Sequence, residues 1–214
     1  MLQTQTVEPR TLELLRKLQS EPLMSSFNLV GGTALALRIG HRKSIDLDFF
    51  TKEEFNIVEL REMLVEKYAM KVAFERGQTL KGFIDGIMID CIRFNYPHIK
   101  DPDIIDGVRL ESIPDIIAMK LDAISHNGTR IKDFIDIATL STMYSLDEML
   151  QFYLAKYPNS NVLMPVKSLV YFDDINFNET IVMLNFDYNW ENFPLSCFGL
   201  QEEDGFCQDR TGHR

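Results

Sequence analysis

The sequence is poor in cysteine and has no long apolar run. Its 214 residues include cysteines only at positions 91, 197 and 207, and none belongs to a CxxC pair that would suggest zinc or redox chemistry. We therefore expect reduced thiols. No apolar stretch approaches the roughly 18 residues that a membrane-spanning helix needs. The first ten residues lack a basic segment followed by an apolar one, so no secretory signal is expected. These absences predict a cytoplasmic protein without membrane association.

The chain also lacks net positive charge. It has 32 acidic and 22 basic residues and a net charge of −10. Neutralising phosphates requires clustered Lys and Arg, so the charge excludes a protein whose whole surface binds nucleic acid. Any RNA contact must be local, and the best candidate is the cluster Arg38, His41, Arg42 and Lys43. The four histidines, His41, His98, His126 and His213, show no ligand-like spacing and are expected at the surface.

The first hundred residues mix helical and strand-like periodicity. Asp85-Gly86 between two strand-like segments is a strong hairpin signal. The glycine pair Gly31-Gly32 separates a short strand from a helix that starts at Thr33. The expected helices are Thr11–Gln19, Thr33–Ile39 and Glu53–Ala69, and the expected strands are Phe27–Val30, Ile45–Phe50, Met70–Phe74, Leu80–Ile84 and Ile87–Phe94.

The following residues are predicted to be helical after an irregular stretch, Asn95–Leu110. Ser112 can cap a helix that has Pro114 in its first turn and ends near Gly128. A helix over Thr129–Thr142 places Lys132, Asp133 and Asp136 on its polar side, and a capping box at Ser145 opens another helix that runs to about Tyr157.

These elements predict an α+β protein with a small mixed sheet, flanking helices and a helical subdomain. We expect a catalytic subdomain over residues 1–110 and a helical subdomain over 111–200, with the functional cleft between them. The stretch 201–214 has no periodicity and is expected to be a disordered tail that contributes nothing to folding or catalysis.

Asp46 and Asp48 form an Asp-x-Asp pair inside an apolar strand. Alternate residues of a strand share a face, and carboxylate oxygens are the ligands that Mg²⁺ prefers. An isolated acidic pair is more often part of a solvated edge strand. Here Ile45, Leu47 and Phe49 predict a half-buried strand, whose acidic face must look into a cavity, a partner or solvent.

Two further features complete the candidate site. Gly31, Gly32 and Thr33 follow a strand and open a helix, an arrangement that offers backbone N–H groups and a positive helix end to a phosphate. Glycine pairs more often simply make turns. Asp90 lies in the apolar strand Ile87–Phe94, where an unpaired carboxylate would be costly and metal binding would remove that cost. These residues predict a metal and phosphate site.

The arrangement of these motifs resembles the nucleotidyltransferase superfamily: an apolar residue, Gly-Gly, thirteen intervening residues, Asp-x-Asp, and a later strand with one acidic residue. The wording of residues 30–37 and 40–50 looks like the AbiEii/AbiGii toxin family, and so do residues 106–110, 118–124 and 132–137 in the same order. The resemblance covers about residues 27–140.

The resemblance implies a magnesium-dependent nucleotidyltransferase that acts as the toxin of a toxin–antitoxin pair. One or two Mg²⁺ ions would be held by Asp46, Asp48 and Asp90. An NTP would be bound by Gly31, Gly32, Thr33, Arg42, Ser44 and Lys120, and Asp133 would be needed for activity. The implied partners are the NTP, a tRNA 3′ end as acceptor and a cognate antitoxin. Asn127-Gly128 departs from the Arg-Gly of many family members, so one cation of the family pattern is missing or replaced by Arg130.

Alternative interpretations stay open. Lys120 can be a solvated helix residue, and Asp133 can be an ion-pair partner of Lys132 or Arg130. If Lys120 instead acts on the triphosphate from across the cleft, its removal should lower turnover much more than stability. The acceptor can be a protein or a small molecule such as an aminoglycoside. The chain can also be a non-catalytic nucleotide-binding module, although its three intact aspartates speak against this.

Overall fold

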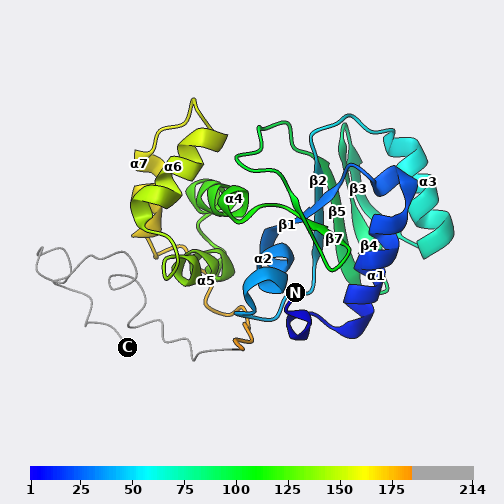
Figure 1. The fold of residues 1–214 in the computed structure, drawn as a ribbon, viewed down its shortest axis with the longest axis horizontal. Helices are drawn as coiled ribbons and strands as arrows, with labels where there is room; N and C mark the ends of the chain where they lie inside the picture. The colour runs from blue at the N-terminus through cyan, green and yellow to red at the C-terminus, as the bar shows by residue number, and fades with distance from the viewer. Residues whose placement is uncertain (185–214) are drawn as a thin grey trace, which may run out of the picture.

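The structure, a computed structural model that describes residues 1–184, is built on a mixed seven-stranded sheet (Figure 1). The order of the strands is β3-β4-β5-β2-β1-β7-β6. The strands are β1 (Asn28–Val30), β2 (Leu47–Thr51), β3 (Lys71–Arg76), β4 (Thr79–Ile84), β5 (Ile87–Arg93), β6 (Asp103–Ile105) and β7 (Val108–Leu110). The predicted α+β class is confirmed.

The helices occupy the N-terminal part of the chain and the region after the sheet. They are α1 (Pro9–Ser20), α2 (Gly31–Ile39), α3 (Ile57–Tyr68), α4 (Ile113–His126), α5 (Ile131–Leu140), α6 (Leu146–Lys156) and α7 (Leu163–Leu169), with 3-10 turns at Thr4–Thr6 and Pro22–Met24. Among residues 1–184, no helix combines the length and apolar character that crossing a bilayer requires. The predicted tail, residues 201–214, lies outside the described residues.

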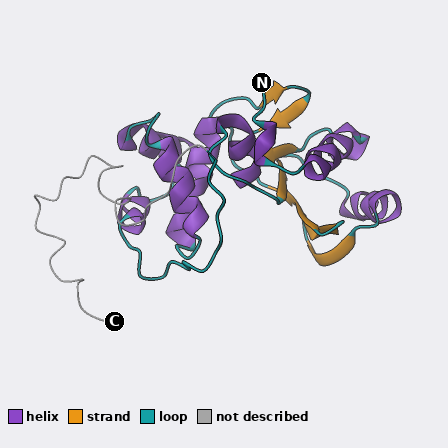
Figure 2. Cartoon of the chain, turned by 90° about the horizontal axis from the view of Figure 1, so that it is seen from below, coloured by secondary structure: helices purple, strands orange, loops and turns teal. Residues whose placement is uncertain are grey.

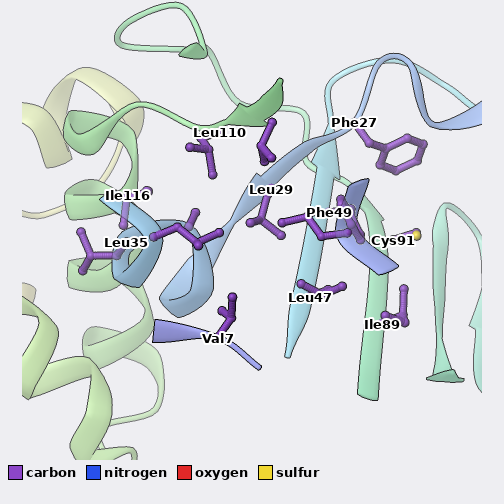
Figure 3. Packing of buried hydrophobic residues seen from close by; sticks show 14 of the residues in the cluster. Val7, Phe27, Leu29, Leu35, Leu47, Phe49, Ile89, Cys91, Leu110 and Ile116 are labelled. Carbon is purple, nitrogen blue, oxygen red and sulfur yellow. The ribbon is translucent and has the colours of Figure 1, made fainter. Parts of the chain in front are cut away.

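Helices lie on both sides of the sheet. α1 and α3 lie beside it on one side, and α4 to α7 form a helical region on the other (Figures 1 and 2). One hydrophobic cluster joins the two regions. Figure 3 shows it running from Ile116 and Leu35 on the helical side, through Leu29, to Phe49 and Cys91 in the sheet. The boundary near residue 110 therefore crosses a continuous core, and the division into two subdomains stays a prediction.

Asp-Gly turns close two of the hairpins, β4–β5 and β6–β7, and the sequence analysis predicted the first of them but not the second. Asp85 and Gly86 have φ values of 50° and 80°, and Asp106 and Gly107 have the same values. Positive φ at both central residues favours Asn or Asp followed by Gly. The hairpin at Asp85-Gly86 is confirmed. The prediction that residues 95–110 are irregular is wrong for their second half, because β6 and β7 form an antiparallel hairpin and β7 joins the main sheet beside β1.

Several predicted boundaries shift for identifiable reasons. Helix α3 begins at Ile57 rather than Glu53, because the Asn56 side chain accepts hydrogen bonds from the first helical N–H groups. Strand β2 begins at Leu47, so Asp46 precedes it and Ile45 is 58% exposed rather than packed. The backbone carbonyl of Asp46 accepts a hydrogen bond from Thr33. The caps predicted at Ser112 and Ser145 are confirmed.

Candidate active site

Two carboxylates lie opposite each other on neighbouring strands, and a third, just before the strand, is near enough to act on them electrostatically. Strands β2 and β5 are parallel neighbours whose register sets Asp48 opposite Asp90, and Asp46 precedes Asp48 by two residues. Burial raises the pKa of Asp48 to about 6, and the negative charges of Asp90 and Asp46 add to the effect. The structure thus brings together the three acidic residues that the sequence singled out.

The chemistry of this cluster fits a divalent cation. One oxygen of Asp90, Oδ2, forms an ion pair with Lys81, whereas its buried Oδ1 has no hydrogen-bond partner among the described residues. Leaving a carboxylate oxygen buried and unpaired is costly. Together with the raised pKa of Asp48, this indicates an acidic site that needs more positive charge than Lys81 supplies. Oxygen-only donors of this kind suit Mg²⁺.

The Gly31-Gly32 turn allows the start of α2 to approach these carboxylates. Gly31 has a φ of 68°, in the left-handed region, and a Cβ at this position would lie 2.5 Å from Asp48 Oδ2. A Cβ on Gly32 would lie 2.4 Å from Arg42 Nη2. Both positions therefore exclude a side chain. The positive N-terminal end of α2 lies beside the acidic cluster, where anions are stabilised.

Thr33 and Ser44 fix the segment that leads into β2. The buried Thr33 hydroxyl donates to the Asp46 carbonyl and lies 2.8 Å from Ser44 Oγ. Because the Thr33 hydroxyl is engaged in these contacts, only its backbone N–H is left to meet a phosphate. The two side chains hold Asp46 in place at the start of the strand.

Arg42 and His41 converge on a buried carboxylate, Asp136 of α5. Arg42 Nε and Nη2 lie 2.7 and 2.8 Å from the two Asp136 oxygens, a bidentate ion pair, and His41 Nε2 lies 2.8 Å from Oδ1. Burial alone would raise the pKa of Asp136, but Arg42 and Lys120 hold it well below its ordinary value. His41 is 1% exposed, so its predicted surface position is wrong.

Lys120 of α4 completes this network. Its Nζ lies 2.5 Å from Asp133 Oδ1 and 2.7 Å from Asp136 Oδ2. Burial opposes the charged form of Lys120, but the two carboxylates raise its pKa. Lys120 is 5% exposed, and Asp133 and Asp136 are also buried. The alternative interpretation of Lys120 as a solvated helix residue is therefore wrong.

Of the two ion-pair partners considered for Asp133, Arg130 lies near it and Lys132 does not pair with it. Arg130 Nε lies 3.4 Å from Asp133 Oδ2, whereas Lys132 pairs with Glu179 at 3.0 Å. The positive charges of Lys120 and Arg130 both act to lower the pKa of Asp48. Both cations therefore lie near enough to Asp48 to act on its carboxylate, although each is paired with an acidic residue of α5.

The predicted surface cluster at residues 38–43 does not form. Arg38 pairs with Asp103 at 2.8 Å and its side chain is 8% exposed. His41 and Arg42 are buried against Asp136. Lys43 alone of the four is exposed, and its Nζ contacts the Gln5 carbonyl. The basic residues of this segment therefore mostly form ion pairs within the fold and do not form an exposed RNA-binding patch.

Sequence reasoning missed Lys81 and underused Asp136. The position of Lys81 could have been predicted, because a two-residue turn at 85–86 sets Ile84 opposite Ile87 and hence Lys81 opposite Asp90. Asp136 lies three residues after Asp133 and therefore on the same side of α5, but helical periodicity alone cannot show that this side is buried.

The fold is that of a nucleotidyltransferase. MenT4, a nucleotidyltransferase toxin from Mycobacterium tuberculosis H37Rv, aligns with a TM-score of 0.53 at 15% identity, covering 78% of this chain and 73% of that one. JHP933 from Helicobacter pylori aligns with a TM-score of 0.47 at 16% identity, covering 76% of this chain and 90% of that one.

The sequence comparisons identify the family. The model described as "Nucleotidyl transferase AbiEii toxin, Type IV TA system" matches residues 13–106 and 82–208. An uncharacterized protein of Aquifex aeolicus (strain VF5) is 34% identical over 168 residues, which are 76% of this chain and 81% of that protein. The chain belongs to the AbiEii family of nucleotidyltransferase toxins of type IV toxin–antitoxin systems. The predicted family and enzyme class are confirmed.

Proposed function

We propose that the protein transfers a nucleoside monophosphate from an NTP to the 3′ hydroxyl of a tRNA and thereby inhibits growth until a cognate antitoxin neutralises it. The observation that carries the proposal is the close approach of the Gly31 turn and the start of α2 to the Asp48 carboxylate. A phosphate chain at this turn would meet backbone N–H groups and the metal-binding carboxylates at once.

The acidic residues are assigned to metal binding. Asp46 and Asp48 would hold one or two Mg²⁺ ions, with Asp90 as the ligand nearer the acceptor. When bound, the cation supplies positive charge that stabilises the triphosphate and the developing pyrophosphate. The oxygen Asp90 Oδ1, which has no hydrogen-bond partner among the described residues, is assigned to accept the proton of the acceptor hydroxyl. The hydroxyl oxygen then bonds to the α-phosphorus, and the bond from that phosphorus to the bridging oxygen of pyrophosphate breaks.

The remaining residues are assigned to the nucleotide. The N–H groups of Gly31, Gly32 and Thr33 would bind the β- and γ-phosphates. Lys120 would meet the triphosphate from α4, and Asp133 would hold its ammonium in position at 2.5 Å. Lys120 thereby neutralises charge on the leaving group.

Arg42 and Ser44 are assigned to the shape of the phosphate-binding turn. The Arg42 guanidinium fills the space beside Gly32 and is tied to Asp136, and Ser44 contacts Thr33. Both residues support nucleotide binding by holding the backbone around the turn.

The test incubates the protein with Mg²⁺, each α-labelled NTP in turn, and a total cell extract. We expect label in small RNA and no label in RNA whose 3′ hydroxyls have been oxidised with periodate. The variant Asp48→Asn is the matched control and should give none. Label in protein or in a small molecule would replace the tRNA acceptor, and no labelled product with any NTP would contradict the transfer itself. Growth arrest on expression should likewise require Asp48.

A further inference from the structure

A row of side chains leads from the acidic cluster to the edge of the sheet. In register, Asp48 of β2 lies opposite Asp90, Asp90 opposite Lys81, and Lys81 opposite Phe74 of the edge strand β3. Opposed residues point to the same side of a sheet, and adjacent strands lie about 4.8 Å apart. The ion pair between Lys81 and Asp90 shows the shared face directly.

Further residues of β3 and β4 continue this face. Phe83 lies opposite Lys71, and Arg76 lies at the other end of β3. We call Lys71, Phe74, Arg76, Lys81 and Phe83 the outer platform. Phe74 and Phe83 are 47% and 43% exposed, and every residue of β3 is exposed.

The opposite face of the same strands is covered. Leu80 and Ile84 are buried there, and Glu75 of β3 pairs at 3.3 Å with Arg61 of α3. The two exposed rings therefore belong to a face that the described part of the chain leaves open, beside the active site.

The charge of the outer platform contrasts with that of the chain. The acidic residues of β3, β4 and β5 are Glu75, which lies on the covered face, and Asp90, which belongs to the site. The platform thus carries Lys71, Arg76 and Lys81, of which Lys81 is paired with Asp90, and no carboxylate, in a chain of net charge −10. Aromatic rings beside cations are what surfaces that bind single-stranded nucleic acid combine, because bases stack on the rings while Lys and Arg meet the phosphates.

We propose that the outer platform binds the unpaired end of a single-stranded nucleic acid and guides its terminal hydroxyl to Asp90. This inference rests on the proposed function, because it concerns the acceptor of that reaction. The row ends at Asp90, the carboxylate assigned to the acceptor. Phe74 and Phe83 accept splayed bases of any sequence, whereas bases stacked inside a duplex cannot reach them. The platform therefore selects a single-stranded end rather than a sequence.

The test measures binding of a short, unstructured, fluorescein-labelled RNA to the full chain by fluorescence anisotropy. Phe74→Ala and Phe83→Ala should each weaken binding about 5- to 100-fold, the effect of losing one stacked base. Tyr171→Ala is the matched control, because Tyr171 is 49% exposed but lies beyond α7 in the helical region. It should leave the affinity unchanged.

The salt dependence tests the cations separately. Lys71→Gln should make the slope of log K against log salt shallower by about 0.7, the contribution of one phosphate contact on a single strand. Lys167→Gln, on α7, should leave the slope unchanged. A duplex of the same sequence should compete poorly. Tight duplex competition would overturn the platform as a single-strand site.

Nucleotide transfer distinguishes failure of the platform from failure of the proposed function. Stabilisation of the protein by Mg²⁺ and NTP should be the same in Phe74→Ala and wild type. If both phenylalanine variants bind RNA like wild type, the platform is overturned even where transfer to RNA is observed. If wild type binds RNA through the rings but transfers no nucleotide, the proposed function fails and the platform stands. A change in oligomeric state on Phe74→Ala, with RNA binding intact, would make the face a protein interface and overturn the proposal.

Discussion

Two carboxylate clusters, one around Asp115 and one around Asp48, have opposite electrostatic environments. Asp115, at the start of α4, lies 2.6 Å from Ser112 Oγ and 2.6 Å from Lys156 Nζ, and accepts from two backbone N–H groups. Although burial opposes it, these partners lower the pKa of Asp115. At Asp48, burial and like charge instead raise the pKa to about 6.

The comparison separates structural from functional acids. Asp115 lies close enough to His98 and Glu111 for the three to hold a metal, but its charge is already balanced by Lys156. The acidic cluster around Asp48 has Lys81 as its direct ion-pair partner and keeps an oxygen of Asp90 unpaired among the described residues. A buried acid whose hydrogen bonds are all made stabilises the fold. A buried acid that has an oxygen without a hydrogen-bond partner and uncompensated negative charge indicates a ligand-binding site.

The largest expected effect is the loss of nucleotide transfer when the functional acid Asp48 is replaced. Asp48→Asn keeps the shape but removes a metal charge, so nucleotide transfer should fall by at least about 10³-fold. Transfer is measured with labelled NTP, and circular dichroism should show an intact fold. Asp101→Asn, at an exposed position, should keep full activity. Wild-type transfer by Asp48→Asn would refute the metal assignment.

Replacing the structural acid Asp115 should lower the stability of the fold. Asp115→Asn leaves the buried Lys156 ammonium without its ionic partner, so the free energy of unfolding should fall by about 3 to 5 kcal/mol. Urea denaturation measures this. A loss below about 1 kcal/mol would show that Asp115 is not the compensated structural acid described above.

Lys120 combines a structural and a proposed catalytic role, because it is buried in ion pairs like Lys156 but is assigned to the triphosphate. Lys120→Ala should lower the free energy of unfolding by about 2 kcal/mol, less than for Asp115 because Asp136 keeps Arg42 as a partner. This replaces the small cost that the sequence predicted. Lys132→Ala, which breaks a partly exposed pair with Glu179, should cost less than about 1 kcal/mol. Equal losses in the two variants by urea denaturation would contradict the buried network.

The pH dependence of stability sharpens the comparison further. The pKa of Asp48 rises from 3.8 to about 6 on folding, so the folded state binds this proton more tightly and metal-free stability falls as pH rises through that window. The stability advantage of Asp48→Asn over wild type should therefore grow between about pH 4 and about pH 6. Asp115, whose pKa is lowered, contributes stability that is lost only as pH falls. Urea midpoints of both proteins without metal test this, and a pH-independent difference would contradict the raised pKa.

The parts of the site that could be predicted from the sequence depend on short-range rules. Period-two alternation predicted Asp48 on the polar side of a half-buried strand, whereas Asp46 lies just before that strand, and the Asp85-Gly86 turn fixed the hairpin that carries Asp90. The glycine pair was expected because a backbone needs room beside a phosphate, and Gly31 does lie where a Cβ would meet Asp48.

What could not be predicted depends on partners distant in the chain. Asp136 is buried because His41 and Arg42, more than 90 residues earlier, meet it across the fold. A helical pattern distinguishes polar from apolar sides but does not show whether a polar side faces water or a buried cation. Strands β6 and β7 have three residues each, too few for a clear periodic signal, and β7 finds its parallel partner β1 only in the folded sheet.

The Arg42–Asp136 ion pair also has a kinetic consequence. It ties the segment before β2 to α5. Both partners are buried, and separating them leaves Arg42 without its ionic partner while Asp136 keeps Lys120 and His41, at a cost of about 3 kcal/mol or more. A conformation with that cost is populated below about one per cent of the time. The segment before β2 and helix α5 are therefore expected to move together rather than apart.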